Sequence, residues 1–233
     1  MKLKSTDLFR DFIALLYPNL CLACSEKVPI PKDIICVQCN YRLPYTNFLD
    51  HSENLLTDRF WGRIEVEAAA AMFYFTKGGI VQKLIHNLKY RGKTKVGVYL
   101  GESYGRKIQT SKFFKDIDVI VPVPLHYTKH RKRGFNQSTK FANGLSKSLG
   151  IPVLPHALLR SSNLSSQTIK TRLERLENVL GSFELAEKNT LADKHILLVD
   201  DVVTTGATLE ACAIKILELP NTKVSIATIA IAK

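Results

Sequence analysis

Acidic residues are missing from a long part of this 233-residue chain. Between Val119 and Leu173 there is no Asp or Glu, whereas nine Lys or Arg residues occur there. The whole chain has 33 Lys and Arg against 21 Asp and Glu, which gives a formal net charge of +12. A basic stretch without acids attracts polyanions, either nucleic acid or a small molecule that carries pyrophosphate. A solvated basic surface is the alternative, but the unbroken absence of acids favours an anion-binding site.

Long apolar runs are also absent. No stretch reaches the roughly 20 residues of a membrane span, and 45% hydrophobic with 23% charged residues is typical of a soluble globular protein. The apolar run Phe12–Tyr17 is preceded by Asp11 and followed by Pro18, so we interpret it as a short amphipathic helix rather than a targeting segment. The expected compartment is the cytoplasm.

Two familiar motifs are incomplete. Gly92-Lys93-Thr94 is similar to the end of a nucleotide-binding P-loop, but Asn87 stands where the first glycine is needed and no strand leads directly into it. His126 and His130 are four residues apart, but no glutamate follows His126, which excludes a zinc-protease helix. We interpret both histidines as polar loop residues. The sequence also has no internal repeat and no low-complexity segment.

Four of the five cysteines form two pairs, Cys21-x2-Cys24 and Cys36-x2-Cys39, with 11 residues between the pairs. Four thiolates at this spacing can hold a structural zinc ion in a tetrahedron, and the ion would fold a segment too short to form its own core. Two disulfides are less consistent with a reducing cytosol. Iron–sulfur ligation uses the same ligands and stays open. Cys212 lies at helical spacing among apolar residues, which predicts a place in the core.

The second half of the chain alternates strand and helix patterns, which predicts an α/β fold with a twisted, mostly parallel sheet flanked by helices. The division that we predict is an N-terminal helix and zinc ribbon over residues 1–50, followed by a larger domain over 51–233. The predicted strands cover residues 66–76, 118–123, 151–153, 182–185, 195–199 and 224–231. The predicted helices cover residues 78–89, 95–108, 134–149 and 207–219.

The predicted strand that begins at His195 is followed by Asp200 and Asp201, then by a small, hydroxyl-rich turn and a helical pattern. In open α/β sheets, ligands bind beyond the carboxyl ends of the strands, where backbone N–H groups and a helix N-terminus hold phosphate. Two carboxylates suit sugar hydroxyls or a hydrated cation instead. The stretch therefore predicts a site for a phosphorylated sugar, with both aspartates facing an open crevice. An ordinary strand-to-helix loop with acidic caps is the alternative.

Two further segments have the residue types that a pyrophosphate ester needs. The predicted loop over residues 122–137 contains Arg131 and Arg133, which can each form paired hydrogen bonds to phosphate, and Gly134, which permits a close backbone approach. The second segment is serine-rich and suits a mobile flap that excludes water; its polar residues are Arg160, Gln167, Arg172, Arg175 and Asn178. A basic surface loop and a surface insert are the respective alternatives.

Taken together, these motifs carry a family resemblance. The run His195–Thr208 resembles the phosphoribosyl-pyrophosphate (PRPP) signature of the type I phosphoribosyltransferase superfamily. Over about residues 8–231, the chain resembles the ComF/GntX-like family of predicted phosphoribosyltransferases, also called competence protein F or amidophosphoribosyltransferase-like. That family combines a four-cysteine ribbon, Lys-Tyr-Arg-Gly, Val-Pro-Val-Pro to Arg-Gly-Phe-Asn-Gln, an Arg…Gln…Arg…Asn flap and the PRPP signature. All five occur here in that order.

The resemblance implies a type I phosphoribosyltransferase-like fold, structural Zn²⁺, and Mg²⁺ bound together with PRPP. It implies that Asp200 and Asp201 bind the ribose hydroxyls, directly or through Mg²⁺, and that Thr204–Thr208 holds the 5′-phosphate. The predicted catalytic residues are Asp200, Asp201, Arg131 and Arg133. The predicted PRPP-binding residues are Asp200, Asp201, Val202, Val203, Thr204, Thr205, Gly206, Ala207, Thr208, Arg160, Gln167 and Arg175. The predicted metal ligands are Cys21, Cys24, Cys36 and Cys39.

Two functions follow as hypotheses. In the first, the protein is an enzyme that transfers ribosyl 5-phosphate from PRPP to an acceptor and releases pyrophosphate; a hood from about residues 50–110 would select the acceptor, but it has no recognisable base-binding signature. In the second, it is a non-catalytic accessory protein of DNA uptake that binds single-stranded nucleic acid or a helicase-like partner. The basic stretch has few interleaved aromatics, which disfavours the second hypothesis. No sequence feature identifies the acceptor or an oligomeric state.

Overall fold

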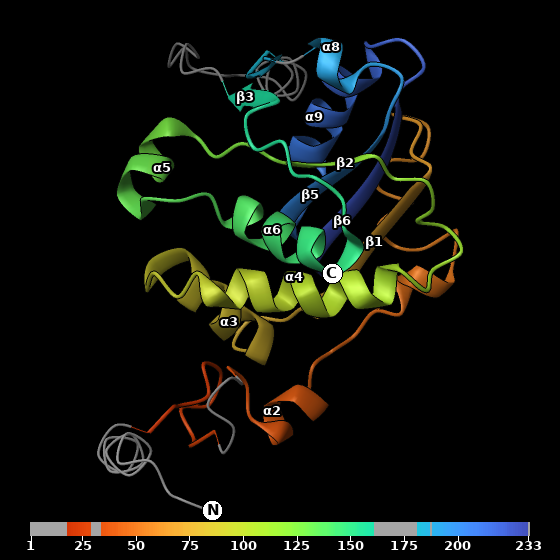
Figure 1. Cartoon of the computed structure of the whole chain (residues 1–233). Helices are drawn as coiled ribbons and strands as arrows, with labels where there is room; N and C mark the ends of the chain where they lie inside the picture. Colours follow the sequence, from red (N-terminus) through yellow and green to blue (C-terminus); the bar gives the residue numbers. More distant parts are fainter. Residues whose placement is uncertain (1–17, 29–33, 161–180, 187, 233) are drawn as a thin grey trace, which may run out of the picture.

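The computed structural model of the chain describes residues 18–28, 34–160, 181–186 and 188–232. Its centre is a parallel four-stranded sheet in the order β1-β6-β5-β2, drawn in Figure 1. The strands are β1 (Ala68–Phe75), β2 (Val119–Pro122), β5 (His195–Val203) and β6 (Lys223–Ala232). The predicted α/β class with a parallel sheet is confirmed.

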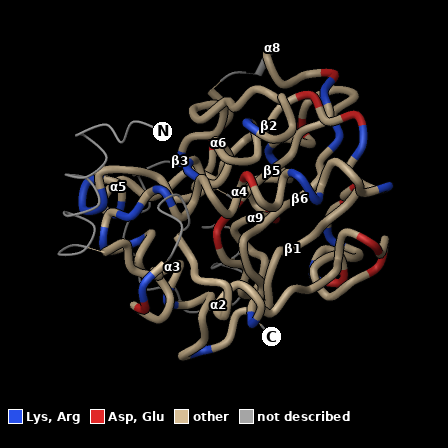
Figure 2. The backbone as a smooth tube through the Cα atoms, turned by 60° about the horizontal axis from the view of Figure 1, so that its bottom comes forward, with Lys and Arg blue, Asp and Glu red and all other residues tan. Residues whose placement is uncertain are grey.

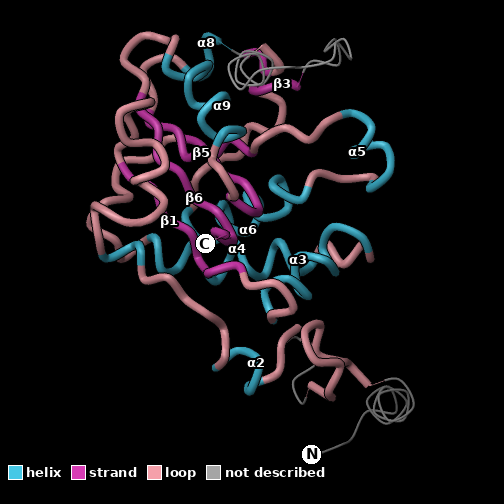
Figure 3. Tube along the Cα trace, turned by 180° about the vertical axis from the view of Figure 1, so that it is seen from behind, coloured by secondary structure: helices cyan, strands magenta, loops and turns pink. Residues whose placement is uncertain are grey.

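Helices cover both faces of this sheet. In Figures 1 and 3, α4 and α6 lie on one side of the strands and α9 lies on the other. The long helices are α3 (Ile80–Tyr90), α4 (Lys95–Ile108), α6 (Gln137–Leu149) and α9 (Ala207–Leu217). The central strand β5 is apolar and fully buried from Ile196 to Val199, as expected for a parallel strand that is covered on both faces.

Helices α4 and α6 cross with their backbones in direct contact. Gly97, Gly101 and Gly105 recur every four residues on α4, so they share one face of that helix. A Cβ atom added to Gly101 would lie 2.2 Å from the carbonyl oxygen of Phe141, and one added to Gly144 would lie 2.2 Å from that of Val98. This close crossing requires glycine on both helices.

Shorter elements complete the described chain. They are α2 (Val37–Tyr41), η1 (Phe48–Asp50), α5 (Tyr127–Arg133), β3 (Leu158–Arg160), β4 (Phe183–Leu185) and α8 (Lys188–Leu191). Strands β3 and β4 pair antiparallel in a separate two-stranded sheet, so the predicted strand at 182–185 lies outside the parallel sheet. The predicted strand at 151–153 joins the parallel sheet through one bridge, between Val153 and Ile120.

Two sequence predictions were wrong. Strand β5 does not end before Asp200 but continues to Val203, because the parallel pairing with β6 extends from His195↔Lys223 to Val203↔Ile231. The segment predicted as the loop 122–137 contains the helix α5. The side chain of His126 accepts a hydrogen bond from the amide of Thr128 and caps α5, and Gly134, at φ 75°, ends it in the left-handed conformation.

The N-terminal segment with α2 lies beneath α3 in Figure 1. Residues 44–46 connect it to the sheet, since the amide of Tyr74 donates to Pro44 O and Tyr45 bridges Phe73 beside β1. The predicted amphipathic helix near Phe12 lies outside the described residues. The helices in the described ranges are all too short or too polar to cross a membrane.

Candidate functional site

The two neighbouring aspartates lie within β5, at the carboxyl edge of the sheet. Side chains alternate along a strand, so Asp200 and Asp201 leave the backbone on opposite sides. Asp200 is half-buried, whereas Asp201 is only 4% exposed. The two carboxylates therefore have different surroundings, although they are adjacent in the sequence.

Asp200 is held by the first turn of α6. Its Oδ1 atom accepts hydrogen bonds from Ser138 Oγ at 2.8 Å and from the amide of Asp201 at 2.8 Å. Asn136 caps α6 by accepting from the amide of Ser138 at 3.0 Å. Its Nδ2 atom also donates to Val123 O at 2.9 Å, just beyond β2. The stretch after β2 thus fixes the α6 N-terminus against Asp200.

Burial raises the pKa of Asp200 to about 7, and the negative charge of Asp201 contributes to the rise. The hydrogen bonds from Ser138 and from the amide of Asp201, and the charge of Lys89, oppose this rise without cancelling it. A carboxyl group with a pKa near neutrality changes charge within the physiological range. Such groups are found often at binding and catalytic sites.

Asp201 departs from the expectation that both acids face an open crevice. It is buried and forms an ion pair with Lys89 Nζ from the last turn of α3. Within the described residues its Oδ2 atom has no other polar partner. Lys89 is a site residue that we did not predict. The signal was present in the sequence, because Lys89 begins the Lys-Tyr-Arg-Gly element.

The turn after β5 is open to solvent at Thr204 and Thr205. Gly206 adopts φ 86°, and the ring of Phe60 lies 3.3 Å from the position that a Cβ atom would take. Helix α9 starts at Ala207, and the first amides of a helix lack partners inside it. The predicted site residues Val202 and Val203 lie in β5 opposite Ala230 and Ile231, rather than in the turn.

Residues 59–63 contact the same region, at α9 and at the end of β6. Arg63 Nη1 pairs with Glu210 Oε2 of α9 at 2.8 Å, and Glu210 is buried. Arg59 Nη2 donates to Ala232 O at the end of β6 at 2.5 Å. With Phe60 beneath Gly206, this segment fixes the start of α9. It belongs to the stretch 50–110 that was predicted as a hood.

The basic residues of α5 gather at one end of the molecule, at the left of Figure 2. Arg133 Nη1 donates to Gln137 Oε1 at 2.8 Å, and its guanidinium lies 5.2 Å from the centre of the Tyr90 ring. Arg131 is exposed. The Cβ position of Gly134 has open space around it, so this glycine serves the end of α5 and not a close approach.

Arg160 ends β3, with its guanidinium 5.2 Å from the centre of the Phe183 ring. Its buried Nε atom has no hydrogen-bond partner within the described ranges. Burial raises the pKa of the Cys212 thiol on α9; the charge of Asp200 raises it further and that of Arg160 lowers it. Arg160, Asp200 and Cys212 are therefore close enough to influence one another. Gln167, Arg172, Arg175 and Asn178 lie outside the described residues.

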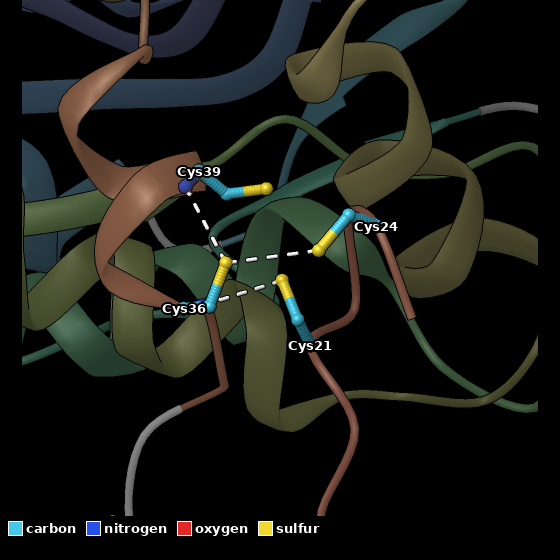
Figure 4. Close-up of side chains that lie close together, drawn as sticks. All are labelled: Cys21, Cys24, Cys36 and Cys39. Carbon is cyan, nitrogen blue, oxygen red and sulfur yellow. Dashed lines mark hydrogen bonds between the residues drawn. The ribbon is translucent and has the colours of Figure 1, made fainter. Parts of the chain in front are cut away.

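The four predicted cysteines come together in the N-terminal segment (Figure 4). Their sulfur atoms all lie within 4.8 Å of one another, and Cys24 Sγ and Cys36 Sγ are 3.6 Å apart. A tetrahedral zinc ion with Zn–S bonds of about 2.3 Å needs sulfurs about 3.8 Å apart. All five cysteines of the chain are free of disulfides. The donor set and its spacing fit a metal ion and not two disulfides.

Backbone amides support this cluster. Cys21 Sγ accepts from the amides of Ala23 at 3.4 Å and Cys36 at 3.3 Å, and Cys36 Sγ accepts from that of Cys39 at 3.4 Å. Burial acts to raise the pKa of the Cys21 thiol, but the hydrogen bonds from backbone amides lower it to about 6. The thiolate is the form that binds a metal, so the backbone around Cys21 favours ligation by this residue, whereas burial raises the pKa of the Cys39 thiol.

The chain matches the family model of the phosphoribosyl transferase domain over residues 97–232. It belongs to that family, and the resemblance stated from the sequence is confirmed. The matched residues extend from α4 to the end of β6 and include Asp200, Asp201 and the turn that leads into α9.

Curated relatives include the DNA utilization protein YhgH of Escherichia coli K12, which is 28% identical over 86% of this chain and 85% of that protein. Competence protein F of Haemophilus influenzae is 37% identical over 40% of this chain, and the match spans 41% of that relative. Competence protein ComFC of Bacillus subtilis is 30% identical over 62% of this chain and 56% of the relative.

Two solved structures are similar to part of this chain. Glutamine PRPP amidotransferase from B. subtilis, complexed with ADP and GMP, is 19% identical with a TM-score of 0.41, over 57% of this chain and 26% of that one. Adenine phosphoribosyltransferase from Saccharomyces cerevisiae is 16% identical with a TM-score of 0.37, over 60% of this chain and 69% of that one.

Proposed function

We propose that this protein binds PRPP and transfers its ribosyl 5-phosphate to an acceptor with release of pyrophosphate. The observation that carries the proposal is the order of features at the edge of β5: Asp200 and Asp201, then a solvent-exposed turn, then the N-terminus of α9. Membership of the phosphoribosyl transferase family supports it. The cytoplasm remains the expected compartment.

In this function, the α9 N-terminus and the turn Thr204–Thr208 bind the 5′-phosphate through backbone amides. Asp200 accepts hydrogen bonds from the ribose hydroxyls, for which its ionised form is the better acceptor. A nucleophile of the acceptor attacks C1 of the ribose, the bond from C1 to the pyrophosphate oxygen breaks, and the nucleophile loses a proton. Arg131, Arg133 and Arg160 stabilise the negative charge on the departing pyrophosphate.

Mg²⁺ with the substrate fits the donor set at the same edge. Magnesium is bound in proteins by one or two carboxylates together with substrate phosphates and water, and the half-buried Asp200 supplies such an oxygen. Asp201 is paired with Lys89 and is the weaker ligand of the two. The metal supplies charge neutralisation of the diphosphate. The four cysteines hold the structural ion, for which we propose zinc.

Titration calorimetry with PRPP and Mg²⁺ tests the binding step, and a panel of acceptors assayed for pyrophosphate release tests transfer. The expected result is saturable PRPP binding that Asp200→Asn and Asp201→Asn together abolish. Gln109→Ala, which removes a hydrogen bond from Gln109 Nε2 at the C-terminal end of α4 to Ser148 O of α6, is the matched control and should bind like the wild type. Absence of binding by the wild type would overturn the proposal.

A second function is favoured by the cations of α5 and by the relatives named for competence and DNA utilization. In it, this helix contacts single-stranded DNA and the protein acts as an accessory factor of DNA uptake. Salt titration separates the two functions. DNA binding through phosphate contacts weakens steeply with salt, and Lys129→Ala with Lys132→Ala would reduce its salt slope. PRPP binding by the same double variant should change little.

A further inference from the structure

Helix α3 contacts both the four-cysteine cluster and the acidic pair of β5. Asn87 Nδ2 donates a 2.7 Å hydrogen bond to the carbonyl of Leu22, which lies between Cys21 and Cys24. Two residues later, Lys89 pairs with Asp201. Residues two apart are separated by about 200° around a helix axis, so these contacts leave α3 on nearly opposite sides.

We propose that α3 couples the metal state of the cysteine cluster to ligand binding at Asp200 and Asp201, and that Asn87 is the positioning residue of this coupling. The inference rests on the proposed PRPP site. It goes beyond that site because it assigns the cysteine cluster an effect on binding, in addition to the stability of its own segment.

Leu22 is the point at which the cluster is attached to α3. Its amide donates to Ile34 O at 2.9 Å, close to Cys36, while its carbonyl accepts from Asn87. Both halves of the cluster are thereby connected to one side chain of α3. The carbonyl of Asn87 accepts from the amides of Arg91 and Lys93, each at 3.2 Å, so the same residue also closes the end of α3 that carries Lys89.

Charge strengthens this attachment. A cleft of about 430 Å³ is lined by residues of both the Cys21–Cys24 loop and α3. Its lining includes Lys83, His86 and Arg91 but no carboxylate. Within the described part of the chain, neither Lys83 nor Arg91 has an acidic partner among the ion pairs. Four thiolates around one divalent ion carry two net negative charges. The loaded cluster therefore attracts the cations along α3.

Loss of the metal removes both effects. A segment that depends on metal for folding loses its shape, and its four sulfurs are no longer gathered beside α3 as one charged cluster. The carbonyl of Leu22 is then no longer held in position for Asn87. The last turn of α3 loses an anchor and Lys89 shifts relative to Asp201. Because the charge of Lys89 also lowers the pKa of Asp200, a shift of Lys89 changes the electrostatic surroundings of both carboxylates.

Coupling of two binding events is reciprocal, which gives the experiment a readout other than activity. The full chain is loaded with zinc, and its zinc affinity is measured by equilibrium competition with a zinc-selective chromogenic chelator, with and without PRPP and Mg²⁺. We expect PRPP to tighten zinc binding by about fivefold or more in the wild type, at the lower end of usual coupling. In Asn87→Ala the effect of PRPP should disappear. Gln109→Ala, which removes a comparable side-chain contact to a carbonyl, should retain it.

Asn87→Asp is a second variant of nearly the same size that cannot donate to Leu22 O, and it should match Asn87→Ala. Zinc-loaded Asn87→Ala should bind PRPP about fivefold or more weakly than the wild type, by the same reciprocity. The coupling would be overturned, with the PRPP site left intact, if both Asn87 variants bound PRPP as tightly as the wild type and PRPP had the same effect on their zinc binding as on that of the wild type. No PRPP binding by the wild type would overturn the proposed function, and this inference with it.

Discussion

Lys89 Nζ is paired with the carboxylate of Asp201 in a largely buried contact, in which the lysine side chain is 20% and the aspartate side chain 6% exposed. Among the described residues, the neighbouring Asp200 forms no ion pair, and burial together with the charge of Asp201 raises its pKa to about 7. Two adjacent residues of one strand thus have different surroundings. Asp201 is part of an ion pair with Lys89, whereas Asp200 can gain or lose a proton near neutral pH.

This difference predicts opposite effects on stability for the two amide substitutions. Asp201→Asn leaves the charge of Lys89 without its partner and should lower the free energy of unfolding by about 1–3 kcal/mol, because an unpaired buried charge is costly. Asp200→Asn should leave stability unchanged or raise it at pH 8, since it removes a carboxylate whose charged form is disfavoured by burial. Urea unfolding at pH 8 measures both. The same sign for both variants would contradict the assignment.

The raised pKa of Asp200 also predicts a pH dependence of ligand binding. If the ionised carboxylate accepts from the ribose hydroxyls, PRPP affinity in Mg²⁺ should increase as pH rises through about 7, the pKa of Asp200, and level off roughly one pH unit above it. The stability contribution has the other sign. A carboxyl group whose folded pKa lies above its unfolded value makes the protein less stable as pH rises between the two values.

Calorimetry from pH 5.5 to 8.5 checks the binding profile. The phosphate groups of PRPP titrate near pH 6 as well, so Asp200→Asn provides the reference. Any pH dependence that survives in this variant belongs to the ligand. A wild-type profile that coincides with that of Asp200→Asn would show that Asp200 does not titrate in the binding range.

Ser138→Ala should move the Asp200 transition to higher pH. The hydrogen bond from Ser138 Oγ stabilises the ionised carboxylate and lowers its pKa, so its removal favours the protonated form. Ser146→Ala, on the same helix and without a side-chain contact to Asp200, is the matched control. The midpoint of the binding profile is the quantity to compare, and a shift to lower pH would contradict the hydrogen-bond assignment.

The cysteine cluster predicts one bound metal ion per chain, measured by atomic emission on the purified protein. Cys24→Ser should reduce the metal content, because serine is a much poorer ligand than a thiolate for zinc. Cys212→Ser should retain the full content, since this buried cysteine lies on α9, outside the cluster. Equal metal content in the wild type and Cys24→Ser would show that the four sulfurs do not form the site.

The α4–α6 crossing predicts a graded effect of alanine. Gly101→Ala places a methyl group 2.2 Å from a backbone oxygen, so the helices must separate, at a cost of about 1–3 kcal/mol or more. Gly105→Ala meets the Cβ of Ser148 at 2.8 Å and should cost less. Urea midpoints give the order. A larger loss for Gly105→Ala would indicate a different crossing.

The sequence predicted much of this fold because its parallel strands are short apolar runs and its helices have a clear period. It predicted the C-terminal end of β5 wrongly, because charged residues usually mark the end of a strand. Here pairing with β6 carries the strand through Asp200 and Asp201. The partner of Asp201 could not be predicted, since Lys89 is 112 residues away in the chain and only the tertiary fold brings α3 to β5.

The close contacts of the glycines between α4 and α6 could not be predicted from the sequence pattern either. Glycine at helical positions normally weakens a helix, and its value at Gly101 exists only when α6 is in place. The basic residues of α5 were predicted to lie in a loop. The cap at His126 and the left-handed Gly134 make them a helix instead. Whether such a short segment forms a loop or a helix depends on the surrounding structure.

The direct backbone contact between α4 and α6 limits where movement can occur when a ligand binds. With backbone against backbone at Gly101 and Gly144, no side chain can change rotamer to let one helix slide along the other. We therefore expect the start of α6, and the serine hydroxyl that it offers to β5, to stay in place. Adjustment to an incoming phosphate is expected in helices without such a contact, such as α3 and α5, and crystals with and without ligand should differ there first.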